Sequence, residues 1–202
     1  MSVRGAEEQL GGGEVRLGGS RLLVRRADAG DRTALEAMFQ RCSLATVYRR
    51  FHGQVRAFPR AYLDEALAGG DMHYAVVCYS GCEAVALASY RTGEPGAAEL
   101  GILIEDAWQR RGLGRLLLGR LVAYAADHGI GVLHAQMLTE QDWITGMLAR
   151  HGSWTSAFGR GVREVTLHLG RGGSAAPEGF GGDAVDGASA ARALPLGGRG
   201  TR

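Results

Sequence analysis

Two arginines and two glycines stand directly before a leucine-rich helical pattern, in the stretch QRRGLGRLLLGRL at residues 109–121. The start of a helix presents backbone N–H groups without intrahelical acceptors, together with the positive end of the helix dipole. Glycines let a ligand approach the main chain, and arginine side chains add positive charge. The stretch therefore predicts a turn that binds a phosphate group.

Two other phosphate-binding motifs do not fit these glycines. A P-loop ends in Gly-Lys-Ser/Thr, and this chain contains no lysine. A dinucleotide-binding turn has the pattern G-x-G-x-x-G in an early βαβ unit, which is not found here. The remaining alternative is an ordinary glycine-containing turn into a core helix, with its arginines in solvent.

The segments around the turn alternate between strand and helix patterns. Strands are predicted at residues 21–27, 72–79, 83–91, 97–105, 132–138 and 162–169, and helices from Asp28 or Asp31 to about Cys42 and at 44–53, 60–70, 112–129 and 140–152. A hairpin joins the second and third strands. This order favours a mixed α/β sheet with one parallel crossover.

Composition limits the remaining possibilities. The 202 residues, 46% hydrophobic, suit one globular domain at 20–170, and the glycine-rich ends at 1–19 and 171–202 are predicted to be disordered tails. A net charge of +2 is too small to indicate nucleic-acid or membrane binding. The start of the chain lacks the apolar core of a secretion signal, so a cytoplasmic location is expected.

The cysteine and arginine content adds two expectations. Three cysteines, Cys42, Cys78 and Cys82, are too few for a disulfide framework or a metal site, so no metal is expected. All 23 basic residues are arginines, which is typical of a GC-rich bacterial genome.

A strand, the turn Gln109-Arg110-Arg111-Gly112-Leu113-Gly114 and a long helix, followed by strand, helix and strand, resemble the acetyl-CoA-binding core of the GNAT superfamily. The resemblance spans residues 20–168 and is greatest to bacterial Pat-type protein lysine acetyltransferases. It implies the GNAT fold, in which a mixed, mostly antiparallel central sheet carries flanking helices. It also implies that the parallel strands at 98–105 and 132–138 splay apart around the cofactor.

The resemblance assigns a cofactor-binding set and an N-acetyltransferase activity that uses acetyl-CoA as co-substrate. The main chain of Ile102, Leu103 and Ile104 would pair with the pantetheine arm, and a backbone N–H near Leu103 or Ile104 would stabilise the oxyanion. The full set is Ile102, Leu103, Ile104, Gln109, Arg110, Arg111, Gly112, Leu113, Gly114, Arg115 and Gln141.

Glu99, ten residues before Gln109, matches the catalytic glutamate of the Pat-type enzymes. Because a glutamate carboxyl has an ordinary pKa of about 4.3 and a lysine amine one of about 10.4, such a base needs partial desolvation and a water relay. The alternative is a surface carboxylate at a strand end. His134 is interpreted as a core or hydrogen-bonded histidine rather than a catalytic one.

The usual helix asparagine and the tyrosine that protonates the thiolate are replaced by Gln141 and Leu148, so the general acid stays unassigned. Residues 43–53, SLATVYRRFHG, resemble the S-x-x-x-x-Y-x-R-F element of Pat-type enzymes. This favours a protein lysine as acceptor, for example on an acyl-CoA synthetase. Tyr48 and Phe51 in it also suit a structural, core role. The alternatives are a small-molecule amine as acceptor, or an inert protein that senses acyl-CoA.

Overall fold

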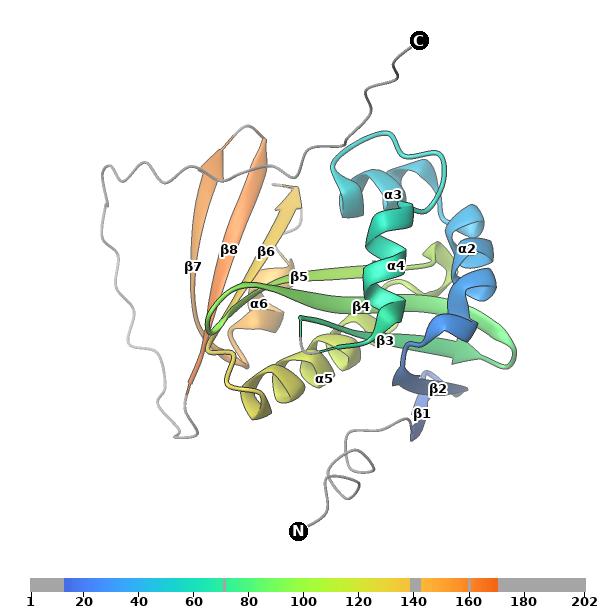
Figure 1. Cartoon of the computed structure of the whole chain (residues 1–202), viewed down its shortest axis with the longest axis horizontal. Coiled ribbons are helices and arrows are strands. Elements are labelled where there is room, and N and C mark those ends of the chain that lie inside the picture. Colours follow the sequence, from blue (N-terminus) through green and yellow to red (C-terminus); the bar gives the residue numbers. More distant parts are fainter. Residues whose placement is uncertain (1–12, 71, 139–142, 160, 171–202) are drawn as a thin grey trace.

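The computed structural model describes residues 13–70, 72–138, 143–159 and 161–170. Eight strands form one sheet in the order β1-β2-β3-β4-β5-β6-β8-β7 (Figure 1). The strands are β1 (Gly13–Leu17), β2 (Ser20–Arg26), β3 (His73–Ser80), β4 (Glu83–Glu94), β5 (Ala97–Ile104), β6 (Val132–Leu138), β7 (Gly152–Gly159) and β8 (Val162–Leu169). The helices are α2 (Arg32–Arg41), α3 (Leu44–Phe51), α4 (Arg60–Ala68), α5 (Leu113–Asp127) and α6 (Trp143–Leu148).

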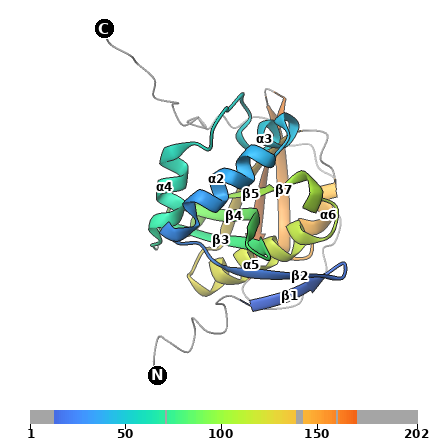
Figure 2. The same cartoon turned by 90° about the vertical axis from the view of Figure 1, so that its right-hand side faces the viewer.

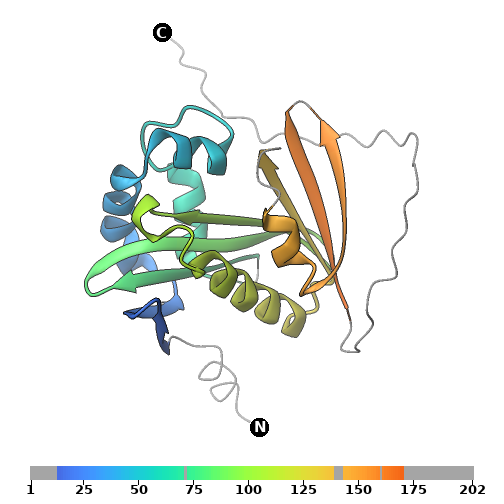
Figure 3. The same cartoon turned by 180° about the vertical axis from the view of Figure 1, so that it is seen from behind.

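Helices cover both faces of the sheet because β3, β4 and β5 bury side chains on both sides. Val76, Ala88 and other residues of one face form a core with Leu117 and Leu121 of α5. Residues of the opposite face pack against α2, α3 and α4 in a second core. Figure 1 shows α4 crossing in front of the strands. Figure 3, seen from behind, shows α5 and α6 in front of the opposite face.

The sheet contains a single parallel pair, β5 and β6, and all other described neighbours are antiparallel. The parallel pairing runs only from Ala97↔Val132 to Leu100↔Ala135. Both strands continue beyond it, to Ile104 and Leu138. The strands therefore splay apart, and β6, β8 and β7 fan away from β5 in Figure 1. This confirms the predicted sheet type and the splayed pair.

The N-terminal boundary of the fold differs from the prediction, because β1 lies within the segment 1–19 that was expected to be disordered. It pairs with β2 at the sheet edge (Figure 2). The connecting Gly18 and Gly19 have φ values of 55° and 82°, the conformation that a two-residue hairpin turn requires. Val15 and Leu17 pack against the α5 core, and this packing holds the short strand at the sheet edge.

The C-terminal part also holds a strand that the pattern did not reveal. Strand β7 has the sequence GSWTSAFG, is mostly exposed, and pairs only with β8 at the other sheet edge. Its serines and threonine lack the strong apolar alternation by which strands are recognised. The tail predicted at 171–202 lies outside the described residues. No helix within the described part is long and apolar enough to span a membrane.

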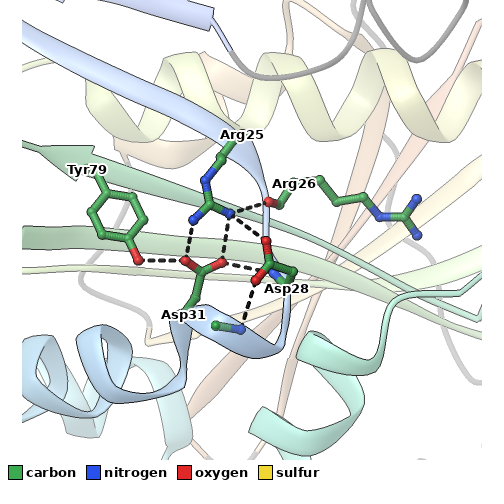
Figure 4. Close-up of polar contacts among 6 residues, drawn as sticks. Arg25, Arg26, Asp28, Asp31 and Tyr79 are labelled. Atoms are coloured by element: carbon green, nitrogen blue, oxygen red, sulfur yellow. Dashed lines mark hydrogen bonds and ion pairs between the residues drawn. The ribbon is translucent and has the colours of Figure 1, made fainter. Parts of the chain in front are cut away.

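A buried ion pair ties the β-sheet to the start of α2 (Figure 4). The Asp31 carboxylate is 1% exposed and accepts hydrogen bonds from Arg25 at 2.9 and 2.5 Å and from the Tyr79 hydroxyl at 2.6 Å. It also accepts one from the Asp28 N–H at 2.9 Å. We call these four residues the closed cluster. Burial alone would raise the pKa of Asp31, but the hydrogen bonds from Arg25, Tyr79 and Asp28 hold it below its ordinary value.

Candidate functional site

The turn before α5 has the open main chain that the sequence predicts. The first backbone hydrogen bond of the helix runs from the Leu116 N–H to the Gly112 carbonyl at 3.1 Å. The N–H groups of Leu113, Gly114 and Arg115 precede it and have no acceptor within the helix. Gly112 has a φ of 90° and caps the helix without a side chain. The turn therefore leaves successive N–H donors without an acceptor in the helix, which suits an anion.

Arg110 adopts a φ of 56°, a conformation that is rare for a residue with a side chain. Such strain is stored where surrounding contacts impose it, often at functional sites. Arg110, Arg111 and Arg115 are all exposed, and the Arg111 guanidinium lies 5.1 Å from the centre of the Trp108 ring. Positive charge thus surrounds the open N–H groups.

Gln109, predicted to contact the cofactor, makes two hydrogen bonds within the protein. Its side-chain NH₂ donates to the Ile104 carbonyl and to the Thr46 hydroxyl, both at 2.9 Å. Both amide hydrogens are therefore used within the protein. Gln109 holds the turn against the end of β5 and against α3.

Asp106 makes a second connection between the turn and α3. Its carboxylate accepts hydrogen bonds from the Ser43 N–H at 2.8 Å, the Ser43 hydroxyl at 2.7 Å and the Thr46 hydroxyl at 2.9 Å. Burial raises the pKa of Asp106, but these bonds outweigh it and leave the pKa below its ordinary value. Glu105 pairs with Arg41 of α2 at 2.9 Å. The turn before α5 and α3 are thus parts of one hydrogen-bonded unit.

The main chain of β5 is open toward the splay. The Glu105 N–H donates to Val85 next to β4 at 3.0 Å, and the register stays regular back to Ala98. Along an antiparallel strand, the N–H and C=O groups of successive residues point alternately to one neighbouring strand and to the other. The main-chain groups of Leu103 therefore face β4, as those of Glu105 do, whereas those of Ile102 and Ile104 face the β6 side. Parallel pairing ends at Leu100, so the N–H groups of Ile102 and Ile104 point into the opening. Of the two predicted oxyanion donors, the geometry favours Ile104 over Leu103.

Glu99 lies in a line of four polar residues across the sheet, which we call the polar row. His73 of β3 is the direct cross-strand partner of Arg91 of β4, and Arg91 is that of Glu99 of β5. Glu99 is in turn the direct partner of His134 of β6. Direct partners share one face of a sheet, so all four side chains lie on the face that carries α2, α3 and α4. The Glu99 side chain is 53% exposed, and its carboxylate lies 3.8 Å from Arg91.

Arg91 also lies 3.8 Å from the Glu65 carboxylate, which is in turn 3.8 Å from the His73 Nδ1. His73 is buried and stacks edge-on against Tyr62 at 5.6 Å. Burial is the main cause that lowers the pKa of His73, and it outweighs the opposing effect of Glu65. His73 is therefore a neutral, buried end of the polar row.

The last turn of α3 lies beside the polar row, since α3 contacts both β5 and β6. His52 ends this helix with a φ of 51°, and burial, together with the charge of Arg50, lowers its pKa. Arg50 lies against β5 at Gly101, where any Cβ would overlap its guanidinium. The splay is thus bordered by β5, β6 and the C-terminal end of α3.

Several of the predicted assignments can now be compared with the structure. His134 is exposed and is therefore not a core residue, but its Nδ1 lies 3.1 Å from the Thr166 hydroxyl, as expected for a hydrogen-bonded histidine. Phe51 packs in the aromatic core of α2–α4, whereas Tyr48 is 46% exposed and is not a core residue. Leu148 is 1% exposed within the α5 core. Gln141 lies outside the described residues.

The cysteines Cys42, Cys78 and Cys82 are all free thiols. Burial, the largest cause in each case, raises the pKa of Cys42 and that of Cys78 to about 12. Neither is suited to act as a nucleophile near neutral pH.

The sequence interpretation did not single out His73 and Arg91, and it included Arg50 only as part of the S-x-x-x-x-Y-x-R-F element. Their proximity to Glu99 depends on the register of separate strands and on the position of α3. One signal was present: Gly101 interrupts an apolar strand, and a glycine inside a strand often marks the close approach of another group. Here the group is the Arg50 guanidinium.

The comparisons with known proteins agree with this geometry. A sequence model of the acetyltransferase (GNAT) family matches residues 34–152. The crystal structure of the GNAT domain of S. lividans PAT is 22% identical, with a TM-score of 0.70, over 78% of this chain and 97% of that domain. The structure of yncA from Salmonella typhimurium with its cofactor acetyl-CoA is 21% identical, with a TM-score of 0.58, over 76% and 96%.

The ribosomal-protein-S18-alanine N-acetyltransferase from Escherichia coli is 18% identical, with a TM-score of 0.56, over 75% of this chain and 96% of that one. At these identities the structural likenesses show the fold alone. The family match covers more than half of the chain and includes the predicted phosphate-binding turn and the strand of Glu99. The chain therefore belongs to the GNAT acetyltransferase family and is a GNAT-type N-acetyltransferase.

Proposed function

We propose that this N-acetyltransferase moves the acetyl group of acetyl-CoA to a lysine side chain of a protein, with Glu99 as the base. The observation that carries the proposal is the placement of Glu99. It is an exposed carboxylate on β5, just before this strand parts from β6. The open main chain of Ile102 begins three residues further along the same strand, about 10 Å from Glu99.

The coenzyme would be held by the turn and by the splayed strands. The open N–H groups of Leu113, Gly114 and Arg115 suit a diphosphate, and Arg110 and Arg111 add charge. Gly112 suits a close approach because it has no side chain. Acetyl-CoA supplies an activated thioester. The backbone N–H of Ile104 would donate a hydrogen bond that stabilises the negative charge on the thioester carbonyl oxygen.

A charge-reversal variant tests this assignment. Arg111→Glu combined with Gly112→Asp should weaken acetyl-CoA binding at least about 100-fold by calorimetry, because it places two carboxylates at the phosphate site. Gly81→Asp is the matched control, since Gly81 also has a positive φ, 60°, in an exposed turn. Unchanged affinity in the double variant, with the control folded, would rule out the turn as the phosphate site.

The transfer requires a neutral amine. In the proposed reaction a proton leaves the lysine ammonium for Glu99, directly or through water, and the freed lone pair attacks the thioester carbon. A C–N bond forms and the C–S bond breaks. The coenzyme thiolate leaves and takes a proton from solvent, because buried Leu148 provides no acid where related enzymes carry tyrosine.

The protein acceptor is supported by the openness of the site and by the α3 sequence. Glu99 and His134 lie on an exposed sheet face, and Leu44 and Tyr48 of α3 are 86% and 46% exposed. A lysine presented on another protein can reach such a surface. The S-x-x-x-x-Y-x-R-F element begins at Ser43, which caps α3 and joins it to the phosphate-binding turn.

A thiol-release assay with acetyl-CoA tests the acceptor and the base together. The panel contains lysine peptides, intact acyl-CoA synthetases and small amines. We expect turnover on protein or peptide lysines, and a loss of about 100-fold or more in kcat for Glu99→Gln. Glu83→Gln, at the exposed first residue of β4, is the matched control. Turnover of small amines alone would exclude a protein acceptor, and full activity of Glu99→Gln would exclude Glu99 as the base.

A further inference from the structure

Arg50, in the last turn of α3, is held in a fixed place by aromatic side chains. Its guanidinium carbon lies 5.0 Å from the centre of the Phe51 ring and 4.9 Å from that of the Tyr62 ring. Tyr62 is itself fixed by a 2.7 Å hydrogen bond between its hydroxyl and that of Ser89. These contacts restrict a side chain that is otherwise long and flexible.

The guanidinium rests directly on the main chain of β5. A Cβ at Gly101 would overlap the Nη2 atom and the central carbon of Arg50. Gly101 lies two residues after Glu99 on the same face of the strand, a separation of about 7 Å. Arg50 therefore lies beside the proposed base, on the side where β5 and β6 part.

Arg50 also carries an uncompensated positive charge. Within the described residues, no carboxylate lies at ion-pair distance from it, and the nearby Glu65 and Glu99 both face Arg91 at 3.8 Å. The neighbouring histidines respond to its charge. Burial is the main cause that lowers the pKa of His52 and His73, and Arg50 lowers both further.

A lysine ammonium at this position meets Glu99, whereas the Arg50 guanidinium beside it has no carboxylate at ion-pair distance among the described residues. An acceptor that brings its own carboxylate would satisfy the free guanidinium through charge-assisted hydrogen bonds. We propose that Arg50 is a specificity-determining residue that binds a carboxylate close to the acetylated amine, so that lysines beside an acidic residue are preferred. This inference rests on the proposed function and refines its substrate class.

Matched acceptor pairs test the inference, since each pair differs only in one negative charge. The first pair is a peptide with lysine followed by glutamate and the same peptide with glutamine. The second pair is free lysine and lysinamide, which offers a carboxylate from a small molecule instead. The readout is the ratio of kcat/KM for the acidic acceptor to that for the neutral one, measured in wild type, R50Q, R50K and the control R49Q.

We expect wild type and R49Q to prefer the acidic member at least about tenfold, and R50Q to lose this preference with little change on the neutral member. R50K should restore part of it, because lysine keeps the charge but not the planar fork. A purely structural role of Arg50 would lower both values together and leave the ratio unchanged. That result, or a ratio near one in wild type, would overturn the inference.

The two proposals fail in different ways. Turnover of the peptide pair without discrimination keeps the lysine acceptor and rejects the role of Arg50. Discrimination on the small-molecule pair alone, lost in R50Q, keeps the role of Arg50 and rejects the protein acceptor. A lack of turnover on both pairs rejects both proposals.

Discussion

The closed cluster and the polar row use the same residue types in opposite ways. In the closed cluster, Arg25 and Asp31 are 2.5 Å apart, and the carboxylate is 1% exposed. In the polar row, Arg91 and Glu99 are 3.8 Å apart, and the carboxylate is 53% exposed. Every oxygen of the first carboxylate has a partner within the protein, whereas the second stays open to solvent.

This difference separates a structural pair from a functional one. A buried carboxylate must be fully hydrogen-bonded, because an unpaired buried charge costs several kcal/mol. A base must instead remain accessible, so its partners have to be distant and weak. A shallow hollow lies beside the closed cluster and is lined by Leu23, Tyr79, Cys82 and others. We nevertheless place the proposed reactive site at the polar row, because its carboxylate is the accessible one.

The largest expected effect comes from breaking the closed cluster. Arg25→Met keeps an alkyl chain against Tyr79 but leaves Asp31 buried without a counter-charge, and should lower the free energy of unfolding by about 3–5 kcal/mol. Arg32→Met is a matched control, because Arg32 also lies 2.5 Å from a carboxylate, Asp64, that is 53% exposed. The control should lose about 1 kcal/mol or less.

Urea denaturation monitored by circular dichroism measures both changes, and the acetyl-CoA affinity of each folded variant shows whether function is spared. Equal losses in the two variants would mean that burial does not decide the strength of these pairs. A loss of acetyl-CoA binding in folded Arg25→Met would connect the closed cluster to the site.

A smaller effect is expected from the buried histidine that ends the polar row. The pKa of His73 is lowered chiefly by burial, with Arg91 and Arg50 acting in the same direction and Glu65 against them. The unfolded chain then binds a proton at higher pH than the folded one. Stability is therefore fully present above about pH 6.5 and falls as the pH drops toward the folded pKa, by at most about 1.4 kcal/mol per pH unit for one proton.

His73→Phe should flatten this dependence by about one proton, measured by urea denaturation between pH 5 and pH 8. Some dependence should remain, because burial also lowers the pKa of His52 and His151. The same substitution at the exposed His168 is the control. An unchanged slope in His73→Phe would show that this histidine is not neutral in the folded protein. The closed cluster responds only at lower pH: the stability that Asp31 contributes begins to fall below its ordinary pKa of 3.8 and is lost as the pH passes its lowered pKa in the folded protein.

The two halves of the site also differ in how far the sequence predicts them. The predicted phosphate-binding turn is contiguous, so Gly112, Gly114 and the arginines around them form a pattern that can be read directly from the sequence. The polar row is assembled from four strands, and its members become neighbours only through cross-strand register. Glu99 was found through a family resemblance, whereas His73 and Arg91 have no local signal.

The fold shows the same division between local and long-range information. Strands and helices with apolar periodicity were predicted, including the single parallel crossover. The edge strands β1 and β7 were not, because each is short or polar and is held by one neighbouring strand. The turn Gly18-Gly19 was a readable hairpin signal, since two glycines in sequence favour this turn. The position of Gln109 could not be read, because its hydrogen bond to Thr46 joins distant segments.

The smallest expected effect concerns the coupling within the polar row. A double-mutant cycle with Arg91→Gln and Glu99→Gln should give a coupling energy of about 0.5 kcal/mol or less in 0.1 M salt, because the pair is long and exposed. In 1 M salt the Debye length of about 3 Å is shorter than the separation, so the coupling should vanish. The same cycle on Arg25 and Asp31 should change little, because buried pairs are screened much less. A salt-resistant coupling above about 1.5 kcal/mol in the polar row would make it a structural pair as well, and Glu99 would then be too tightly held to exchange protons with an incoming amine.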